Sequence, residues 1–262
     1  MFVKAKKSLG QNFLIDKNVI RKIISLSDFF NKDVLEVGPG TGSLTENILM
    51  NKPNKLFLIE KDNFLCEKLK LRFQNEVDII NDDILKIDEY KISKNKLIVF
   101  GNLPYNISTE IICNWIIRIK KNFWFSELIL MFQKEVADRI ISEINTSNYG
   151  RLSILLNWKM NVKKIFDVKP SSFSPKPKID SSVLRFTPKD NFLTIKDNKN
   201  LEMITRIFFN QRRKMIKKPL KQLFKNYELV AKNLDLDLKL RPQNLSLDTY
   251  IAIVNEYEKS IC

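Results

Sequence analysis

Hydrophobic positions in the first two thirds of the chain alternate between short continuous runs and helical stripes. Continuous apolar runs, which are typical of buried strands, lie at 34–37, 55–59, 77–80, 96–100 and 128–132. Apolar residues at helical spacing predict helices after Asp16 and at 44–50, 63–73, 108–120 and 134–144. Strands that alternate with crossover helices form parallel sheets with both faces covered, so the pattern predicts an α/β fold.

The pattern changes twice toward the C-terminus. Two strand-like stretches within 161–186 flank the proline-rich loop 170–177 and predict an antiparallel hairpin at the edge of the sheet. After Pro188, lysine, aspartate and asparagine replace apolar residues, and from Leu201 onward the spacing is helical. We therefore predict a Rossmann-like α/β domain over 1–188 and a small all-helical domain over 189–262.

The absence of histidine from the 262 residues restricts the chemistry. It excludes Ser-His-Asp and Cys-His catalysis, imidazole acid–base chemistry and His-ligated metals. Cys66, Cys113 and Cys262 are far apart and form no CxxC pair, which favours a reducing cytoplasm and no metal site. No apolar run reaches the roughly 18–20 residues of a membrane-spanning helix, and the polar N-terminal segment does not resemble a signal peptide. We expect a cytoplasmic protein that binds neither membrane nor metal.

The charge balance is strongly basic, with 45 lysines and arginines against 30 acidic residues and a formal net charge of +15. This excess favours a polyanionic partner, nucleic acid before membrane, but a lysine bias inherited from base composition explains the same numbers. In the helical region, Arg212, Arg213 and Lys214 are candidates for phosphate contacts. The two arginines are favoured, since a guanidinium binds phosphate through two hydrogen bonds. The alternative for these residues is a solvated surface.

Three of the six glycines fall within Gly38-Pro-Gly-Thr-Gly42, directly after a predicted strand and before a predicted helix. Open α/β sheets bind nucleotides at this position, and glycine lets the backbone approach the ligand closely. Ser43 replaces the third glycine of the dinucleotide fingerprint GxGxxG, which favours a nucleoside without a diphosphate. Gly38 and Gly40 are therefore candidate cofactor-binding residues, and the alternative is a tight turn without a ligand.

Acidic residues follow the next two predicted strands. Glu60 ends the strand at 55–59, where a carboxylate can accept hydrogen bonds from both hydroxyls of a ribose. Asp82 and Asp83 follow the strand at 77–80, where an acid can accept a hydrogen bond from an adenine amino group. Each acid taken alone is equally consistent with a helix N-cap or a solvated loop charge. Together they favour an adenosyl cofactor such as S-adenosylmethionine.

The segment Asn102-Leu-Pro-Tyr105 follows the predicted strand at 96–100 and precedes a predicted helix. The amino group of adenine is a poor nucleophile because its lone pair is delocalised into the ring. The Asn102 side-chain carbonyl and the Leu103 backbone carbonyl can accept its N–H groups and raise the electron density on nitrogen. Pro104 removes a competing N–H donor, and Tyr105 offers a face on which a base can stack. The alternative is an ordinary turn with Tyr105 in the core.

Seven motifs occur in order along nearly the whole chain. They are Lys7-Ser-Leu-Gly-Gln-Asn-Phe-Leu14, Leu35-Glu-Val-Gly-Pro-Gly-Thr-Gly42, Asn102-Leu-Pro-Tyr-Asn-Ile-Ser108, Gln133-Lys-Glu-Val136, Tyr149-Gly-Arg-Leu-Ser153, Phe173-Ser-Pro-Lys-Pro-Lys-Ile-Asp-Ser181 and Phe209-Asn-Gln-Arg-Arg-Lys214. This set closely resembles the ribosomal RNA small-subunit adenine N6,N6-dimethyltransferases. The resemblance implies dimethylation of two adjacent adenosines in the loop of the 3′-terminal hairpin of 16S rRNA, with S-adenosylmethionine as methyl donor and a role in small-subunit biogenesis.

The resemblance also implies roles for individual residues. Asn12 and Leu14 would lie along the methionine end of the cofactor. Asn102 would lie between the cofactor and the target amine, and Phe173 would close on the face of the base opposite Tyr105. The other cofactor-binding residues keep the roles given above, with Gly38 lining the cofactor, Glu60 at the ribose and Asp83 at the adenine.

One feature departs from the resemblance. Asp82 stands where an uncharged residue is expected, so it could exchange roles with Asp83. The expected partner is small-subunit rRNA within an immature ribosomal subunit, bound by a monomer. One alternative is a large-subunit rRNA adenine methyltransferase of the macrolide-resistance type, which shares the glycine loop and an Asn-x-Pro-Tyr segment. Another is a ribosome-assembly checkpoint factor for which methylation is secondary.

Overall fold

The computed structural model describes residues 5–6 and 9–261, which divide into two compact units. Unit 1 consists of the described residues of Met1–Ile112 together with Lys121–Ala137 and Val162–Pro188. Unit 2 consists of Cys113–Lys120, Asp138–Asn161 and the described residues of Lys189–Cys262. Unit 2 therefore includes two segments that precede Pro188, whereas the predicted helical domain is a single block that begins at 189.

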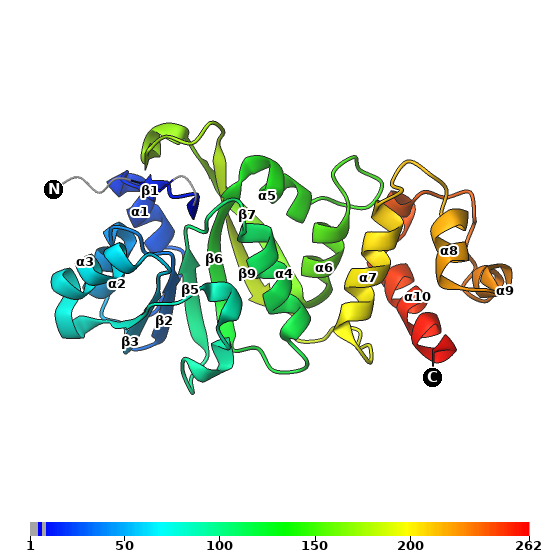
Figure 1. The fold of residues 1–262 in the computed structure, drawn as a ribbon, viewed down its shortest axis with the longest axis horizontal. Coiled ribbons are helices and arrows are strands. Elements are labelled where there is room, and N and C mark those ends of the chain that lie inside the picture. The colour runs from blue at the N-terminus through cyan, green and yellow to red at the C-terminus, as the bar shows by residue number, and fades with distance from the viewer. Residues whose placement is uncertain (1–4, 7–8, 262) are drawn as a thin grey trace. The chain divides into compact units, whose positions relative to one another are not determined.

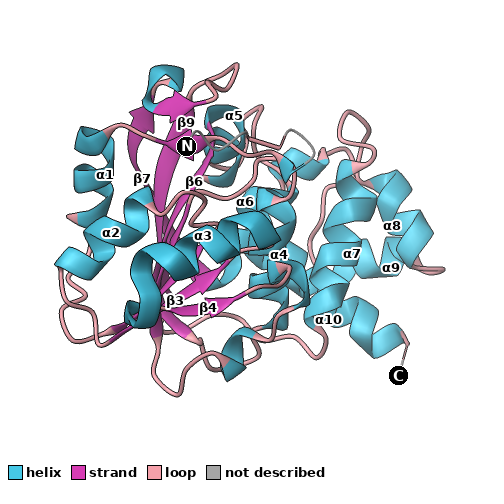
Figure 2. Cartoon of the chain, turned by 60° about the vertical axis from the view of Figure 1, so that its left-hand side comes forward, coloured by secondary structure: helices cyan, strands magenta, loops and turns pink. Residues whose placement is uncertain are grey.

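Among the described residues, a seven-stranded sheet forms the centre of unit 1 (Figure 2). Its strands are β2 (Asp33–Val37), β3 (Lys55–Ile59), β4 (Asp78–Ile80), β5 (Leu97–Gly101), β6 (Phe125–Gln133), β7 (Met160–Val168) and β9 (Ser181–Pro188). They lie in the order β4-β3-β2-β5-β6-β9-β7. The first five strands of this order are parallel to one another, and β9 pairs antiparallel with β6. The predicted parallel strands are thus present. The predicted hairpin strands are neighbours, but only β7 lies at the edge.

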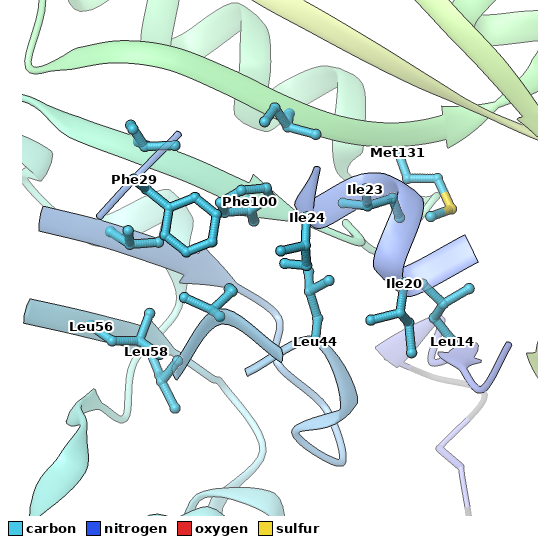
Figure 3. Packing of buried hydrophobic residues seen from close by; sticks show 14 of the residues in the cluster. Leu14, Ile20, Ile23, Ile24, Phe29, Leu44, Leu56, Leu58, Phe100 and Met131 are labelled. Atoms are coloured by element: carbon cyan, nitrogen blue, oxygen red, sulfur yellow. The ribbon is translucent and has the colours of Figure 1, made fainter. Parts of the chain in front are cut away.

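Helices alternate with these strands, as predicted (Figure 1). They are α1 (Lys17–Ile24), α2 (Ser43–Met50), α3 (Asn63–Phe73), α4 (Ser108–Arg118) and α5 (Lys134–Ile140). Asp16 caps α1, because its side chain accepts hydrogen bonds from the first turn of that helix. The apolar face of α1 presents Ile20, Ile23 and Ile24 to the core beside Leu44 and Phe100 (Figure 3). This stripe is the one that the spacing of apolar residues predicts.

A small second sheet fastens the N-terminal segment to the proline-rich loop. It pairs β1 (Phe13–Leu14) antiparallel with β8 (Phe173–Ser174), with Leu14 opposite Phe173. The next backbone hydrogen bond, from Ile15 N to Ser172 O at 2.9 Å, continues this contact. Two segments about 160 residues apart in sequence are therefore held together by backbone hydrogen bonds.

Unit 2 is rich in helices. They are α6 (Arg151–Lys159), α7 (Asn198–Phe209), α8 (Lys217–Leu223), α9 (Tyr227–Asn233) and α10 (Leu247–Ser260). The sequence did not predict α6, because Ile154, Leu155 and Leu156 are contiguous and form no helical stripe. Ile154 and Leu155 pack in one core with residues of α7 and α10, which explains why this segment belongs to unit 2. In the described part of the chain, no helix is both long and apolar enough to cross a membrane.

Candidate functional site

A cavity in unit 1 lies where strands β2, β3 and β5 end. Residues that follow these strands line it, together with residues 9–14 of the N-terminal segment and 129–131 of β6. The predicted cofactor-binding and catalytic residues at this cavity are Asn12, Leu14, Gly38, Gly40, Glu60, Asp83, Asn102, Leu103, Pro104 and Tyr105. The topology explains the grouping. Parallel strands end at one edge of the sheet. The strand order reverses between β2 and β5, because β3 and β4 lie on one side of this point and β6 lies on the other, and such folds bind ligands there.

The glycine loop that joins β2 to α2 forms one wall of this cavity. A Cβ on Gly40 would lie 2.8 Å from Phe13 Cδ1, and a Cβ on Gly42 would lie 2.6 Å from Phe73 Cε2. Both glycines also have positive φ, at +56° and +81°, where other residues are strained. A side chain at either position would therefore push the loop away from its neighbours and disturb the wall.

Glu60 lies directly after β3 and is almost completely buried at the cavity. Its Oε1 accepts a hydrogen bond from Asp62 N at 2.9 Å, and its Oε2 accepts one from Gly40 N at 3.2 Å. Burial raises the pKa of Glu60, although the two backbone donors oppose the shift. The carboxyl group is therefore held between the glycine loop and the start of α3, with its orientation set by backbone groups.

The two aspartates that follow β4 both line the cavity, but their environments differ. Asp83 Oδ2 lies 2.7 Å from Lys61 Nζ, and this hydrogen bond holds the pKa of Asp83 below its ordinary value. Asp82 is exposed, and its Oδ1 accepts a hydrogen bond from Asp83 N at 2.6 Å. Asp82 thus supports the backbone of its neighbour. The assignment of an adenine contact to Asp83 stays a prediction.

Glu36 is a cavity residue that the sequence analysis did not single out. It lies in the buried strand β2, and its Oε2 accepts a hydrogen bond from Thr45 Oγ1 at 2.6 Å. Burial raises the pKa of Glu36 to about 8, and Glu60 adds to the effect, so Glu36 is mostly neutral at pH 7. A single acid within the apolar run 34–37 was the available signal. Among the described residues that line the cavity, the acidic ones are Glu36, Glu60, Asp82 and Asp83, and Lys61 is the one basic residue.

Separate contacts hold the two polar side chains of the segment after β5. Asn102 Nδ2 donates a hydrogen bond to Asn12 O at 2.8 Å. Because the amide nitrogen is used in this way, the Asn102 Oδ1 is the atom available to accept a hydrogen bond from a ligand. Tyr105 Oη lies 2.5 Å from the Oγ of the buried Ser181, and burial raises the pKa of this phenol, so it is neutral. Ser181 is a second residue that the sequence analysis missed, since it lies 76 positions away.

Phe173, predicted to contact the target base, does not line the cavity. Its side chain is 1% exposed and belongs to the hydrophobic core of unit 1, together with Leu14 and Met131. The pairing of β8 with β1 accounts for this position, because it places Phe173 opposite the buried Leu14. In the first motif, Lys7 and Ser8 lie outside the described residues.

The predicted phosphate contacts lie in the turn after α7 of unit 2 and form two classes. Arg212 is half-buried, and its Nη2 donates hydrogen bonds to Ser147 O and, at 2.9 Å, to Tyr149 O. Its side chain thus holds the segment before α6. Arg213 and Lys214 are exposed. The structure therefore gives Arg212 a structural role, and phosphate binding by the two exposed residues stays a prediction.

Comparison with known proteins finds similarity to ribosomal RNA adenine methyltransferases along nearly the whole chain. The family model "Ribosomal RNA adenine dimethylase" matches residues 2–259. A relative from Pelagibacter ubique (strain HTCC1062), named ribosomal RNA small subunit methyltransferase A, is 66% identical over 98% of this chain and 98% of its own length. A protein of the same name from a Wolbachia of Drosophila simulans (strain wRi) is 39% identical over 99% of this chain and 96% of its own length.

Solved structures agree with this result. The crystal structure of a dimethyladenosine transferase from Plasmodium falciparum has a TM-score of 0.79 and 27% identity, and the match covers 94% of this chain and 98% of that one. The 23S rRNA methyltransferase ErmE shares the fold, with a TM-score of 0.66, 20% identity and coverage of 94% and 100%. The predicted resemblance and the Rossmann-like methyltransferase fold are therefore confirmed. The chain belongs to the ribosomal RNA adenine dimethylase family.

Proposed function

We propose that this protein transfers methyl groups from S-adenosylmethionine to the N6 amines of two adjacent adenosines in the 3′-terminal hairpin loop of small-subunit rRNA. The observation that carries the proposal is the joining, in one cavity, of Glu60 and Asp83 with Asn102 and Tyr105. The first pair suits a nucleoside donor, and the second suits a target adenine. The name shared by the curated relatives supports the small subunit as the source of the RNA. The proposed partner is an immature subunit, and the proposed setting is the cytoplasm.

The cavity residues suit S-adenosylmethionine in shape and in charge. The glycine loop keeps its wall free of side chains at Gly40, where a Cβ would collide with Phe13. The donor carries a positive sulfonium, and with Glu36 mostly neutral the acids Glu60, Asp82 and Asp83 still outnumber the single basic residue Lys61 at the cavity. Glu60 and Asp83 would hold its ribose and adenine. Bound there, the donor supplies an electrophilic methyl group.

Asn102 would activate the target amine. Its Nδ2 is bound to Asn12 O, so its Oδ1 would accept an N–H of the adenine amine, and the Leu103 carbonyl would accept the other. Both bonds strengthen as positive charge develops on nitrogen, which stabilises the transition state more than the ground state. The amine becomes acidic only as the methyl group arrives, so it can lose its proton to water or to a carbonyl. A chain without histidine can therefore carry out this reaction.

The proposed function is tested by incubating the protein with S-adenosylmethionine and either immature small subunits or naked rRNA. Mass measurement of nuclease fragments from the 3′-terminal hairpin should show two adenosines that each gain two methyl groups. Methylation of large-subunit rRNA instead would support the macrolide-resistance alternative. Subunit binding without methyl transfer would support the checkpoint alternative.

Replacing Ser181 with alanine is expected to raise KM for RNA several-fold and to change donor affinity little. The hydroxyl of Ser181 holds Tyr105 through the bond between Oγ and Oη, and stacking of a base on an aromatic ring contributes roughly 1–3 kcal/mol. Tyr105→Phe removes the same bond and should behave alike. Ser126→Ala, which removes a hydroxyl at the opposite end of the sheet from the cavity, is the matched control. An unchanged KM in both test variants would contradict the positioning of Tyr105 by Ser181.

The exposed pair Arg213 and Lys214 is expected to contribute to RNA binding. Each phosphate contact adds about 0.9 to the logarithmic salt slope on a duplex and about 0.7 on a single strand, so replacing both with alanine should reduce the slope by up to two contacts. Fluorescence anisotropy across a salt series measures this slope. Lys52→Ala, at an exposed lysine that precedes β3, is the control and should change this slope little.

Arg212→Ala should instead lower the melting temperature, because it releases the carbonyls of Ser147 and Tyr149.

A further inference from the structure

Asp62 binds more groups than a helix cap requires. It precedes α3 and caps it by accepting a hydrogen bond from Phe64 N at 3.1 Å. The same carboxylate accepts hydrogen bonds from Lys6 Nζ at 2.8 Å and from Gln11 Nε2 at 3.1 Å. Its side chain is only 2% exposed. Burial raises the pKa of Asp62, but the bonds from Lys6, Gln11 and Phe64 outweigh it, so the pKa lies below its ordinary value. The two distant donors fasten a separate segment.

That segment is residues 9–14, here called the leader strap, and all six of its residues line the cavity. Gln11 belongs to the strap, and Lys6 is joined to it because Lys6 N donates to Gln11 Oε1 at 2.8 Å and Leu9 N donates to Lys6 O at 3.1 Å. At one end, Gln11 is bound to Asp62. At the other end, Leu14 pairs with Phe173 in the ladder of β1 and β8. Between these points the ring of Phe13 lies against Gly40 of the glycine loop. The strap is therefore anchored at two points, through Gln11 and through Leu14, while its residues line the cavity.

Two further hydrogen bonds connect Asp62 and the strap to the groups that bind ligands. Asn102 Nδ2 donates to Asn12 O of the strap at 2.8 Å, which sets the direction of the Asn102 amide. The backbone N–H of Asp62 donates to Glu60 Oε1 at 2.9 Å. Asp62 thus orients Glu60 through its backbone and Asn102 through its side chain and the strap.

We infer that Asp62 is a positioning residue, a latch that holds the leader strap over the cavity and couples binding of the methyl donor to the orientation of Asn102. The identity of the two ligands rests on the proposed function. The latch itself rests on the contacts of Lys6 and Gln11 with Asp62. A charged, buried acceptor strengthens both hydrogen bonds, so the strap should be released when both donors are removed or when the acceptor loses its charge.

The test removes the donors and leaves the helix cap in place. Lys6→Met combined with Gln11→Leu keeps the Asp62 bond to Phe64 N, and Asp62→Asn keeps the size of the side chain and its ability to cap. Both variants are expected to bind S-adenosylhomocysteine about tenfold more weakly by calorimetry. Amide hydrogen exchange of residues 9–14 should be faster with and without this ligand. At saturating donor, kcat on rRNA should also fall about tenfold, because Asn102 is no longer held by the strap.

Matched controls separate a latch from a general loss of stability. Lys70→Met removes a lysine from an exposed ion pair with Glu67 on α3, and Asp197→Asn changes the cap of α7 in unit 2. Neither should alter strap exchange or ligand affinity. Adding Asp62→Asn to the variant that lacks both donors should cost little more than either change alone. The inference would be overturned if the losses of ligand affinity from the two changes were fully additive. It would also be overturned if residues 9–14 of the Lys6→Met, Gln11→Leu variant exchanged amide hydrogen at the wild-type rate.

The outcomes also distinguish the latch from the proposed function. If the wild-type protein bound no S-adenosylhomocysteine and methylated no rRNA, the proposed function would fail. Amide hydrogen exchange of residues 9–14, measured without ligand, would still report whether Lys6 and Gln11 hold this segment. The latch would fail and the proposed function would stand if the wild-type protein methylated rRNA and the Lys6→Met, Gln11→Leu variant matched it. The quantities compared are kcat, affinity for S-adenosylhomocysteine and amide hydrogen exchange of residues 9–14.

Discussion

Replacing Asn102 with alanine is expected to reduce the rate of methyl transfer about 10²–10³-fold, the usual cost of losing one preorganised polar group that acts on the transition state. The Asn102 Oδ1 is the acceptor left available when Nδ2 binds Asn12 O, and no other side-chain amide follows β5 before Asn106. Donor affinity should fall much less than the rate. Single-turnover methylation of rRNA at saturating donor measures the effect directly.

The control for this experiment is Asn51→Ala, which removes an exposed amide at the end of α2. It should methylate at the wild-type rate. Near-normal single-turnover rates in Asn102→Ala would remove the side chain from the mechanism. The Leu103 carbonyl and Tyr105 would then be the groups left to position the base.

Replacing Glu60 with alanine is expected to weaken binding of S-adenosylmethionine well over tenfold while the fold remains. Two hydrogen bonds from ribose hydroxyls to a charged acceptor contribute roughly 1.5–3 kcal/mol each before the site reorganises. The substitution also frees Gly40 N and Asp62 N, which the carboxylate holds in the structure. Isothermal titration calorimetry measures the affinity. Glu67→Ala, an exposed acid on α3 paired with Lys70, should bind the donor as the wild type does.

The pH dependence of donor affinity gives an independent check on Glu60. Burial raises the pKa of its carboxyl group above the ordinary value of 4.5, so the group takes up a proton at a higher pH than an exposed glutamate. In the proposed function, the carboxylate is the form that would accept both ribose hydroxyls. Affinity should therefore be complete above the raised pKa and fall as the pH is lowered through it, and Glu60→Gln should abolish this dependence. The same fall in Glu60→Gln would assign the titration to another group.

Elements whose signals lie within a few residues could be predicted from the sequence. The predicted ranges 55–59 and 63–73 are those of β3 and α3, because an apolar run and a capped helical stripe depend on local residues. Helix α6 was missed because burial on all sides leaves no stripe for a periodic pattern to show. Tertiary packing, which decides such cases, is not visible in a short window.

The candidate site shows the same division. The cavity residues at strand ends were predictable, since a parallel sheet brings the carboxyl ends of its strands to one edge whatever the loops contain. The positions of Phe173 and Arg212 were not, because Leu14 and Ser147, their partners, lie far away in sequence. An aromatic in a proline-rich loop and an arginine in a basic cluster resemble binding residues until those partners are known.

The acidic lining of the cavity contrasts with the net charge of +15 on the chain, and this contrast sorts the reactants of the proposed reaction. The net positive charge favours approach of the RNA backbone, while the acids at the cavity disfavour a phosphate there. The same acids favour a donor that arrives with a positive sulfonium. Once the methyl group has left, the spent donor is a neutral thioether and loses that attraction. At equal concentrations, the acids should therefore favour fresh donor over spent donor in the cavity.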